Sequence, residues 1–134
     1  MRMEAKLKHL ELIQGVINRL ATNSFLLKGW SVLLVSGLLA LHQHVPGKHV
    51  GLLALVPTVV FWGLDGYFLS LERKFRALYD EVRMWDEEKI DFSMDIRKIR
   101  DQGTDWLSTT FSKSLVPFHG SLLFVVGTFL CFIA

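Results

Sequence analysis

The chain alternates between long apolar runs and segments rich in charge. Three runs, 25–41, 50–70 and 115–134, have the length of a membrane span. The hydrocarbon core of a bilayer is about 30 Å thick, and about 20 helical residues cross it. Apolar residues clustered in this way are untypical of a soluble domain. The pattern therefore predicts an all-α membrane protein with three transmembrane helices.

The placement of charge predicts the orientation of these spans. Residues 1–28 hold five Lys and Arg against two Asp and Glu, and residues 71–114 hold nine against ten. The short connection 42–49 holds Lys48 alone. Because cytoplasmic segments of membrane proteins carry the excess of Lys and Arg, we expect residues 1–24 and 71–114 in the cytoplasm. The turn at 42–49 and the C-terminus then lie in the periplasm.

Residues 1–24 have the pattern of an amphipathic helix. Apolar side chains recur there at intervals of three and four, which is one face of an α-helix: Leu7, Leu10, Ile13, Ile17 and Leu20. We expect this helix to run straight into the first span, with Gly15 its one weak point.

A longer periodic pattern follows the second span. Apolar residues alternate three and four apart, interrupted by Lys89, as in a coiled-coil seam: Phe75, Leu78, Val82, Trp85, Phe92, Ile96 and Ile99. No Gly or Pro occurs between Tyr67 and Gln102. The sequence therefore predicts a long cytoplasmic helical extension of span two, ending at Gly103. The N-terminal helix can cover part of this seam, and we expect the remainder to join subunits of a homo-oligomer.

Asp65 is an acidic residue inside an apolar run. Ionisable residues within a membrane are costly and mark functional sites or pairs. Lys28 lies at a similar depth on span one, so a structural Lys28–Asp65 ion pair is one interpretation. A pore or gate is the other, with the hydroxyl groups of Ser121 and Thr128 on span three as further lining.

Cations of the cytoplasmic segments could hold a polyanion, since Arg and Lys match phosphate oxygens. On one continuous helix, intervals of seven would place Arg76, Arg83 and Arg97 on one stripe. The alternative is a solvated face with internal pairs such as Glu72–Arg76. The full predicted set is Lys6, Lys8, Arg19, Arg76, Arg83, Arg97, Lys98 and Arg100.

Residue types for catalysis or cofactor binding do not form a known pattern. There is no G-x-S-x-G, phosphate-binding glycine loop or H-E-x-x-H, so we expect neither an enzyme nor a cofactor. His42, His44 and His49 crowd the turn at 42–49, but short exposed His clusters seldom bind metal, and none is predicted. The single Cys131 excludes an intramolecular disulfide.

Two segments carry a resemblance to a known family. They are IQGVINRLATNSFLLKGWSV at 13–32 and FWGLDGYFLSLERKFRALYDEVR at 61–83. Together with the three-span layout, they resemble small bacterial inner-membrane effectors of anti-phage defence loci, among them the membrane effectors of the Hailong system. The resemblance implies a tetrameric ion channel. It also implies a partner nucleotidyltransferase whose short DNA product holds that channel closed.

The sequence thus leads to one expected function and one rival. The expected function is a homo-oligomeric ion channel of the bacterial inner membrane, gated by a cytoplasmic oligonucleotide during anti-phage defence. The rival is a non-conducting accessory membrane subunit that docks a soluble partner through its cytoplasmic helix. Conductance separates the two.

Overall fold

The protein is a bundle of helices. The computed structural model describes residues 2–45, 47–99 and 104–132, without the side chain of Lys48. Every regular element in these ranges is helical, which confirms the all-α class. The elements in chain order are α1 (Arg2–His42), α2 (Lys48–Leu53), α3 (Leu55–Val82), the 3₁₀ turn η1 (Glu87–Lys89), α4 (Trp106–Thr110) and α5 (Val116–Phe132).

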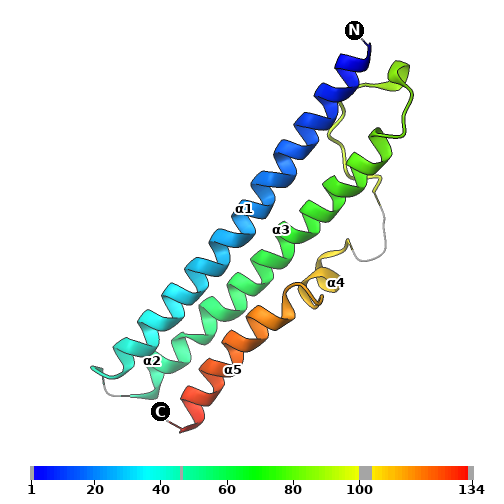
Figure 1. Ribbon diagram of the computed structural model, residues 1–134. Coiled ribbons are helices and arrows are strands. Elements are labelled where there is room, and N and C mark those ends of the chain that lie inside the picture. The colour runs from blue at the N-terminus through cyan, green and yellow to red at the C-terminus, as the bar shows by residue number, and fades with distance from the viewer. Residues whose placement is uncertain (1, 46, 100–103, 133–134) are drawn as a thin grey trace.

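The two long helices α1 and α3 form an antiparallel hairpin (Figure 1). α1 is unbroken over 41 residues, about 60 Å at 1.5 Å per residue. The prediction that the N-terminal helix continues into the first apolar run is therefore confirmed, and Gly15 does not interrupt it. In Figure 1, α5 lies against the half of the hairpin nearest the turn that joins α1 to α2. The C-terminus lies at that end, and the N-terminus lies at the other.

The second apolar run contains one break, between α2 and α3. Pro57 has no N–H group, so it cannot donate to the carbonyl of Leu53, and its ring crowds that carbonyl. The helix tightens at this point, where the Ala54 N–H donates to Gly51 O at 3.1 Å. The hydroxyl of Thr58 donates to Ala54 O at 2.8 Å. The break between α2 and α3 therefore lies just before Pro57.

The prediction that this helix continues to Gly103 is wrong. α3 ends at Val82 and is followed by a turn, η1 and an irregular segment, 90–96. Gln102 and Gly103, where we expected the end, lie outside the described residues. The last turn of α3 has no basic residue. It carries Asp80 and Glu81 instead, which repel the negative end of the helix dipole.

Hydrogen bonds from backbone N–H groups to side chains hold this irregular segment. Asp91 Oδ1 accepts the Ser93 N–H at 3.0 Å, and Asp95 Oδ1 accepts the Arg97 N–H at 2.9 Å. Such local bonds compete with the helical ladder. Phe92 has a positive φ of 56°, which also excludes a helix at this point.

The predicted seam packs mostly within the chain. Leu78 and Val82 of α3 are buried with Ile13 and Ile17 of α1, while Phe75, Trp85 and Ile96 pack around them. Ile99 is also buried, and Phe92 is exposed. Residues beyond Val82 reach this core by folding back, so the seven residues do not form one helical stripe. The interpretation that the N-terminal helix covers part of the seam is confirmed.

Two helices are long and apolar enough to cross a membrane, Arg2–His42 and His49–Val82. A core helix of a soluble protein can meet the same criterion, but it is mostly buried. Here, 17% and 22% of the span-length windows are buried. α5 is apolar but shorter, with 17 residues. The outer surfaces of all three therefore present large apolar side chains to their surroundings.

Candidate functional site

The candidate site is a buried polar cluster around Asp65, where α1, α3 and α5 meet. Asp65 Oδ2 lies 2.5 Å from Lys28 Nζ of α1 and 2.7 Å from His119 Nε2 of α5. Asp65 Oδ1 accepts a hydrogen bond from the hydroxyl of Ser24. Lys28 Nζ also donates to Ser24 Oγ at 2.9 Å. Both carboxylate oxygens are therefore bonded, and Oδ2 faces two nitrogen atoms.

Aromatic side chains enclose His119. The ring of Trp62 stacks on the imidazole, with centroids 5.8 Å apart and planes at 7°. Phe118 meets it edge-on at 5.0 Å. Trp62 Nε1 donates to the carbonyl of Thr110 at 2.8 Å, which joins this wall to α4. The imidazole is thereby held in one orientation toward Asp65.

Gly66 allows α4 to approach the site. A Cβ atom at this position would lie 2.1 Å from Thr110 Oγ1 and 3.1 Å from the Thr110 Cα. No side chain fits so close to a neighbouring backbone. The glycine next to Asp65 is therefore a requirement of the packing of α4 on α3.

The cluster satisfies the electrostatic needs of a buried carboxylate. Asp65 and His119 have no exposed surface, whereas the side chain of Lys28 is 25% exposed. Removing a charge from water costs several kcal/mol per ion unless partners compensate it. With Asp65 negative, Lys28 positive and His119 neutral, the net charge of the cluster is zero. The Lys28–Asp65 pair predicted from the sequence is present.

Sequence reasoning missed His119 and Ser24. His119 is an ionisable residue within an apolar run, so the argument that selected Asp65 would have selected it too. Ser24 had a weaker signal. It lies one helical turn before Lys28, and a single serine does not stand out in such a segment.

The predicted pore residues of α5 do not share the buried position of Asp65. Ser121 and Thr128 are both exposed, and seven residues separate them, so they lie on one face of the helix. The hydroxyl of Ser121 donates to Pro117 O within α5. These two residues form part of the outer surface of the chain.

Most of the predicted polyanion-binding cations have partners within the chain. Lys6 Nζ donates to Trp85 O at 2.9 Å, where it caps the turn after α3. Arg97 is not on a helix, so its predicted stripe with Arg76 and Arg83 is wrong. Arg19 and Lys98 are exposed, and Arg100 lies outside the described residues. The other predicted cations that have a partner form the ion pairs Lys8–Glu11, Arg76–Glu72, Arg83–Asp80 and Arg97–Asp95.

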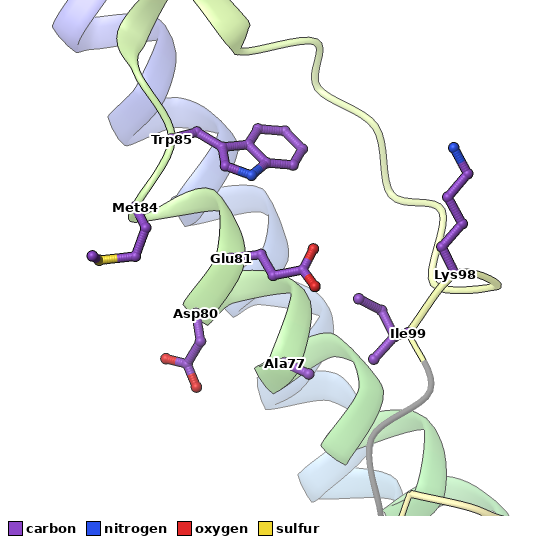
Figure 2. A pocket seen from close by; sticks show the side chains of 7 residues that line it. All are labelled: Ala77, Asp80, Glu81, Met84, Trp85, Lys98 and Ile99. Carbon is purple, nitrogen blue, oxygen red and sulfur yellow. The ribbon is translucent and has the colours of Figure 1, made fainter.

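A cavity of about 700 Å³ opens beside the C-terminal end of α3 (Figure 2). Glu81 points toward the chain that carries Lys98 and Ile99, while the ammonium group of Lys98 points away from α3. The wall of the cavity therefore holds the carboxylates of Asp80 and Glu81 and the single cation of Lys98, a charge balance that does not suit a polyanion. The cavity is lined by Ala77, Asp80, Glu81, Met84, Trp85, Lys98 and Ile99.

Metal binding has no support in the described residues. No group of three or more His, Cys, Asp or Glu is placed there to hold a metal ion. In the turn region, the ring of His42 packs edge-on against Phe129, 5.3 Å away.

Known proteins provide no counterpart for this arrangement. No family model, curated protein or solved structure matches the chain. The function is therefore argued from the Asp65 cluster and the surfaces around it.

Proposed function

We propose that the chain is the subunit of a homo-oligomeric ion channel of the bacterial inner membrane. The observation that carries this proposal is the buried cluster of Asp65, Lys28 and His119 between three apolar helices. Ionisable groups inside a membrane are costly, and they mark ion paths or gates. A protein that needed only to anchor itself would be more simply built with apolar residues at these positions.

The membrane arrangement follows the predicted topology. α1 and α2–α3 form two spans and α5 forms the third, and the N-terminus and residues 71–114 lie in the cytoplasm. The exposed apolar surfaces of these helices support this arrangement. α5 is shorter than an average span, but a modest mismatch is accommodated by local thinning of the bilayer.

Contacts between subunits are proposed along helix faces that the single chain leaves open. A Cβ atom at Gly29, Gly37 or Gly127 would meet nothing within 4 Å. Small residues allow close helix approach in lipid. The hydroxyl groups of Ser121 and Thr128 lie on an exposed face of α5 and would line the axis. The tetrameric state is taken from the resemblance at 13–32 and 61–83.

The regulator is proposed to be a short DNA oligomer made by a partner nucleotidyltransferase, which holds the channel closed until phage infection. This role rests on the same resemblance. Arg19 is exposed, and the Arg83–Asp80 pair is long, at 3.4 Å, and lies on the surface. Exposed ion pairs contribute about 0–1 kcal/mol. A phosphate group could therefore displace Asp80 from Arg83 at little cost.

A non-conducting accessory subunit is the alternative. The internal pairing of most cytoplasmic cations and the acidic wall of the 700 Å³ cavity favour it. In that case, residues 71–99 would dock a soluble partner, and the Asp65 cluster would only hold the helices together.

The test is the loss of an imposed membrane potential, followed with a voltage-sensitive dye, in liposomes that contain the purified protein, with and without short single-stranded DNA. We expect the wild type to dissipate the potential and DNA to suppress this loss. The double variant Arg19→Glu with Arg83→Glu should dissipate the potential whether or not DNA is present, because both side chains are exposed cations. Lys113→Glu reverses one exposed charge in the loop before α5 and serves as the control. Protein that is inserted and folded but leaves the potential intact would favour the accessory subunit.

A further inference from the structure

The Asp65 cluster contains one more basic group than it needs for neutrality. Lys28 alone balances the carboxylate, yet His119 also faces Asp65 Oδ2, at 2.7 Å. Imidazole changes its charge near neutral pH, where Lys and Asp normally do not. The cluster can therefore hold either zero or one positive charge overall, depending on one proton at His119.

The free nitrogen of this imidazole provides a place for that proton. His119 has no exposed surface, and its Nδ1 atom has no hydrogen-bond partner among the described residues. A buried polar atom without a partner is uncommon and calls for an explanation. The facing charged groups are Asp65 of α3 and Lys28 of α1. From α4, the packed group is the uncharged Thr110 carbonyl, reached through Trp62.

Further polar groups continue the line of the cluster along the hairpin. Thr58, Asp65 and Glu72 recur at intervals of seven on the buried face of α3. On α1, Ser31 is fully buried, and its hydroxyl has no partner in the described chain. Ser24 lies opposite Asp65, and Val35 packs with Ala54. In this antiparallel register, Ser31 and Thr58 fall between these two levels.

The line of polar groups ends at an apolar layer on the side of the 42–49 turn. Val35, Ala54 and Val126 are almost fully buried there, with leucines packed around them. Toward the other end of the hairpin, Ser70 and Glu72 remain buried and polar. The apolar layer therefore adjoins the cluster on one side, while on the other side Ser70 and Glu72 continue the polar side chains as far as the apolar core of Ile13, Ile17, Leu78 and Val82.

We propose that the Asp65–His119 pair is a proton-binding site, loaded from the cytoplasmic end of the helices. A proton that binds Nδ1 forms an N–H bond and makes the imidazole cationic. Transfer of the Nε2 proton to Asp65 Oδ2 then breaks one N–H bond and forms one O–H bond. It leaves a neutral imidazole, a neutral carboxyl group and the Lys28 ammonium. The ion handled by the proposed channel is accordingly the proton. The direction of loading rests on the proposed function, whereas the binding does not.

The first test measures proton binding without any need for conduction. Full-length protein labelled with ¹⁵N-histidine is reconstituted in liposomes and followed by solid-state NMR. We expect Nδ1 of His119 to gain a proton as the pH of the sample is lowered. His119→Gln assigns the signal, because it keeps an amide donor toward Asp65 but cannot take up a proton. His119 signals that show Nδ1 without a proton at every pH tested would overturn the proposal.

The second test measures flux with a pH-sensitive dye inside the liposomes, and valinomycin with potassium clamps the voltage. Proton entry should exceed that of empty liposomes and fall at least tenfold in His119→Gln. His44→Gln removes an exposed histidine of the turn and should leave entry unchanged. Proton entry that is equal in wild type and His119→Gln would overturn the proton as the transported ion. Titration of His119 without flux of any ion would uphold the site and defeat the proposed channel.

Discussion

At the scale of the residue, Asp65 organises the chain. Its two carboxylate oxygens join Ser24 and Lys28 of α1 to His119 of α5, so a single side chain connects three helices. A buried ion pair adds little net stability when it is intact, but the removal of one partner leaves a charge without compensation. The energetic role of Asp65 is therefore visible only when its partners are changed together with it.

A double-mutant cycle tests this role. Asp65→Asn leaves the Lys28 ammonium unpaired and should cost about 3 kcal/mol, near the low end for a broken buried pair. Lys28→Met in the same chain removes the stranded charge and should restore more than half of the lost stability. Thermal unfolding in detergent, followed by circular dichroism, measures both. Lys28→Met alone completes the cycle, and a loss in the double variant equal to the sum of the two single losses would show that the pair is not coupled.

The close packing of Thr110 on Gly66 can also be tested by substitution. Gly66→Ala places a methyl group against the Thr110 backbone and should destabilise the protein by about 1–3 kcal/mol. Gly15→Ala is the matched control, because nothing lies within 4 Å of its added Cβ. The control should gain up to about 1 kcal/mol from helix propensity. Chemical denaturation compares the two, and equal stability of both variants would argue against the close packing of α4.

At the scale of the element, the sequence predicted where a helix continues better than where it ends. The periodic apolar positions predicted correctly that α1 continues from the N-terminal segment into the first apolar run. The end of α3 was not predictable from the heptad pattern, because Leu78, Val82 and Trp85 fit the same spacing in a helix or in a folded-back chain. The difference lies in Asp91 and Asp95, whose carboxylates hold backbone N–H groups.

The candidate site shows the same division. Lys28 and Asp65 could be paired from depth alone, since each lies a similar distance from the cytoplasmic end of its run. To pair His119 with Asp65, one would have needed to know which side of α5 packs against α3. The sequence of α5 alone contains no signal for that direction. The polyanion site stays a prediction, and five of its cations have partners in the chain that the sequence pattern did not indicate.

The turn at 95–97 has a measurable electrostatic signature. Hydrogen bonds from Arg97 lower the pKa of Asp95 from its ordinary value of 3.8 to about 2. Because the folded-state pKa is depressed, this contribution is fully present above about pH 4 and is lost as the pH falls through about 2. Arg97→Ala should return the Asp95 pKa toward its ordinary value. Carboxyl ¹³C NMR titration checks this, and an unchanged titration would contradict the bonding at this turn.

At the scale of the whole molecule, the chain is a hairpin of two long helices, and a third apolar helix joins it at the charged cluster around Asp65. Its orientation can be tested in cells. In a Cys131→Ser background, Gln43→Cys should react with an impermeant maleimide from the periplasm. Met84→Cys should react only after the membrane is opened. The reverse result would invert the topology and place the 71–114 segment outside.

Ion conduction is the central claim about the assembled molecule. Single-channel recording from purified protein in a planar bilayer tests it most directly. If the protein is an ion channel, the wild type should give discrete current steps, and these should shrink or disappear in Asp65→Asn protein shown to be folded. A flat trace from wild-type protein, with its insertion and folding verified in the same membranes, would contradict it.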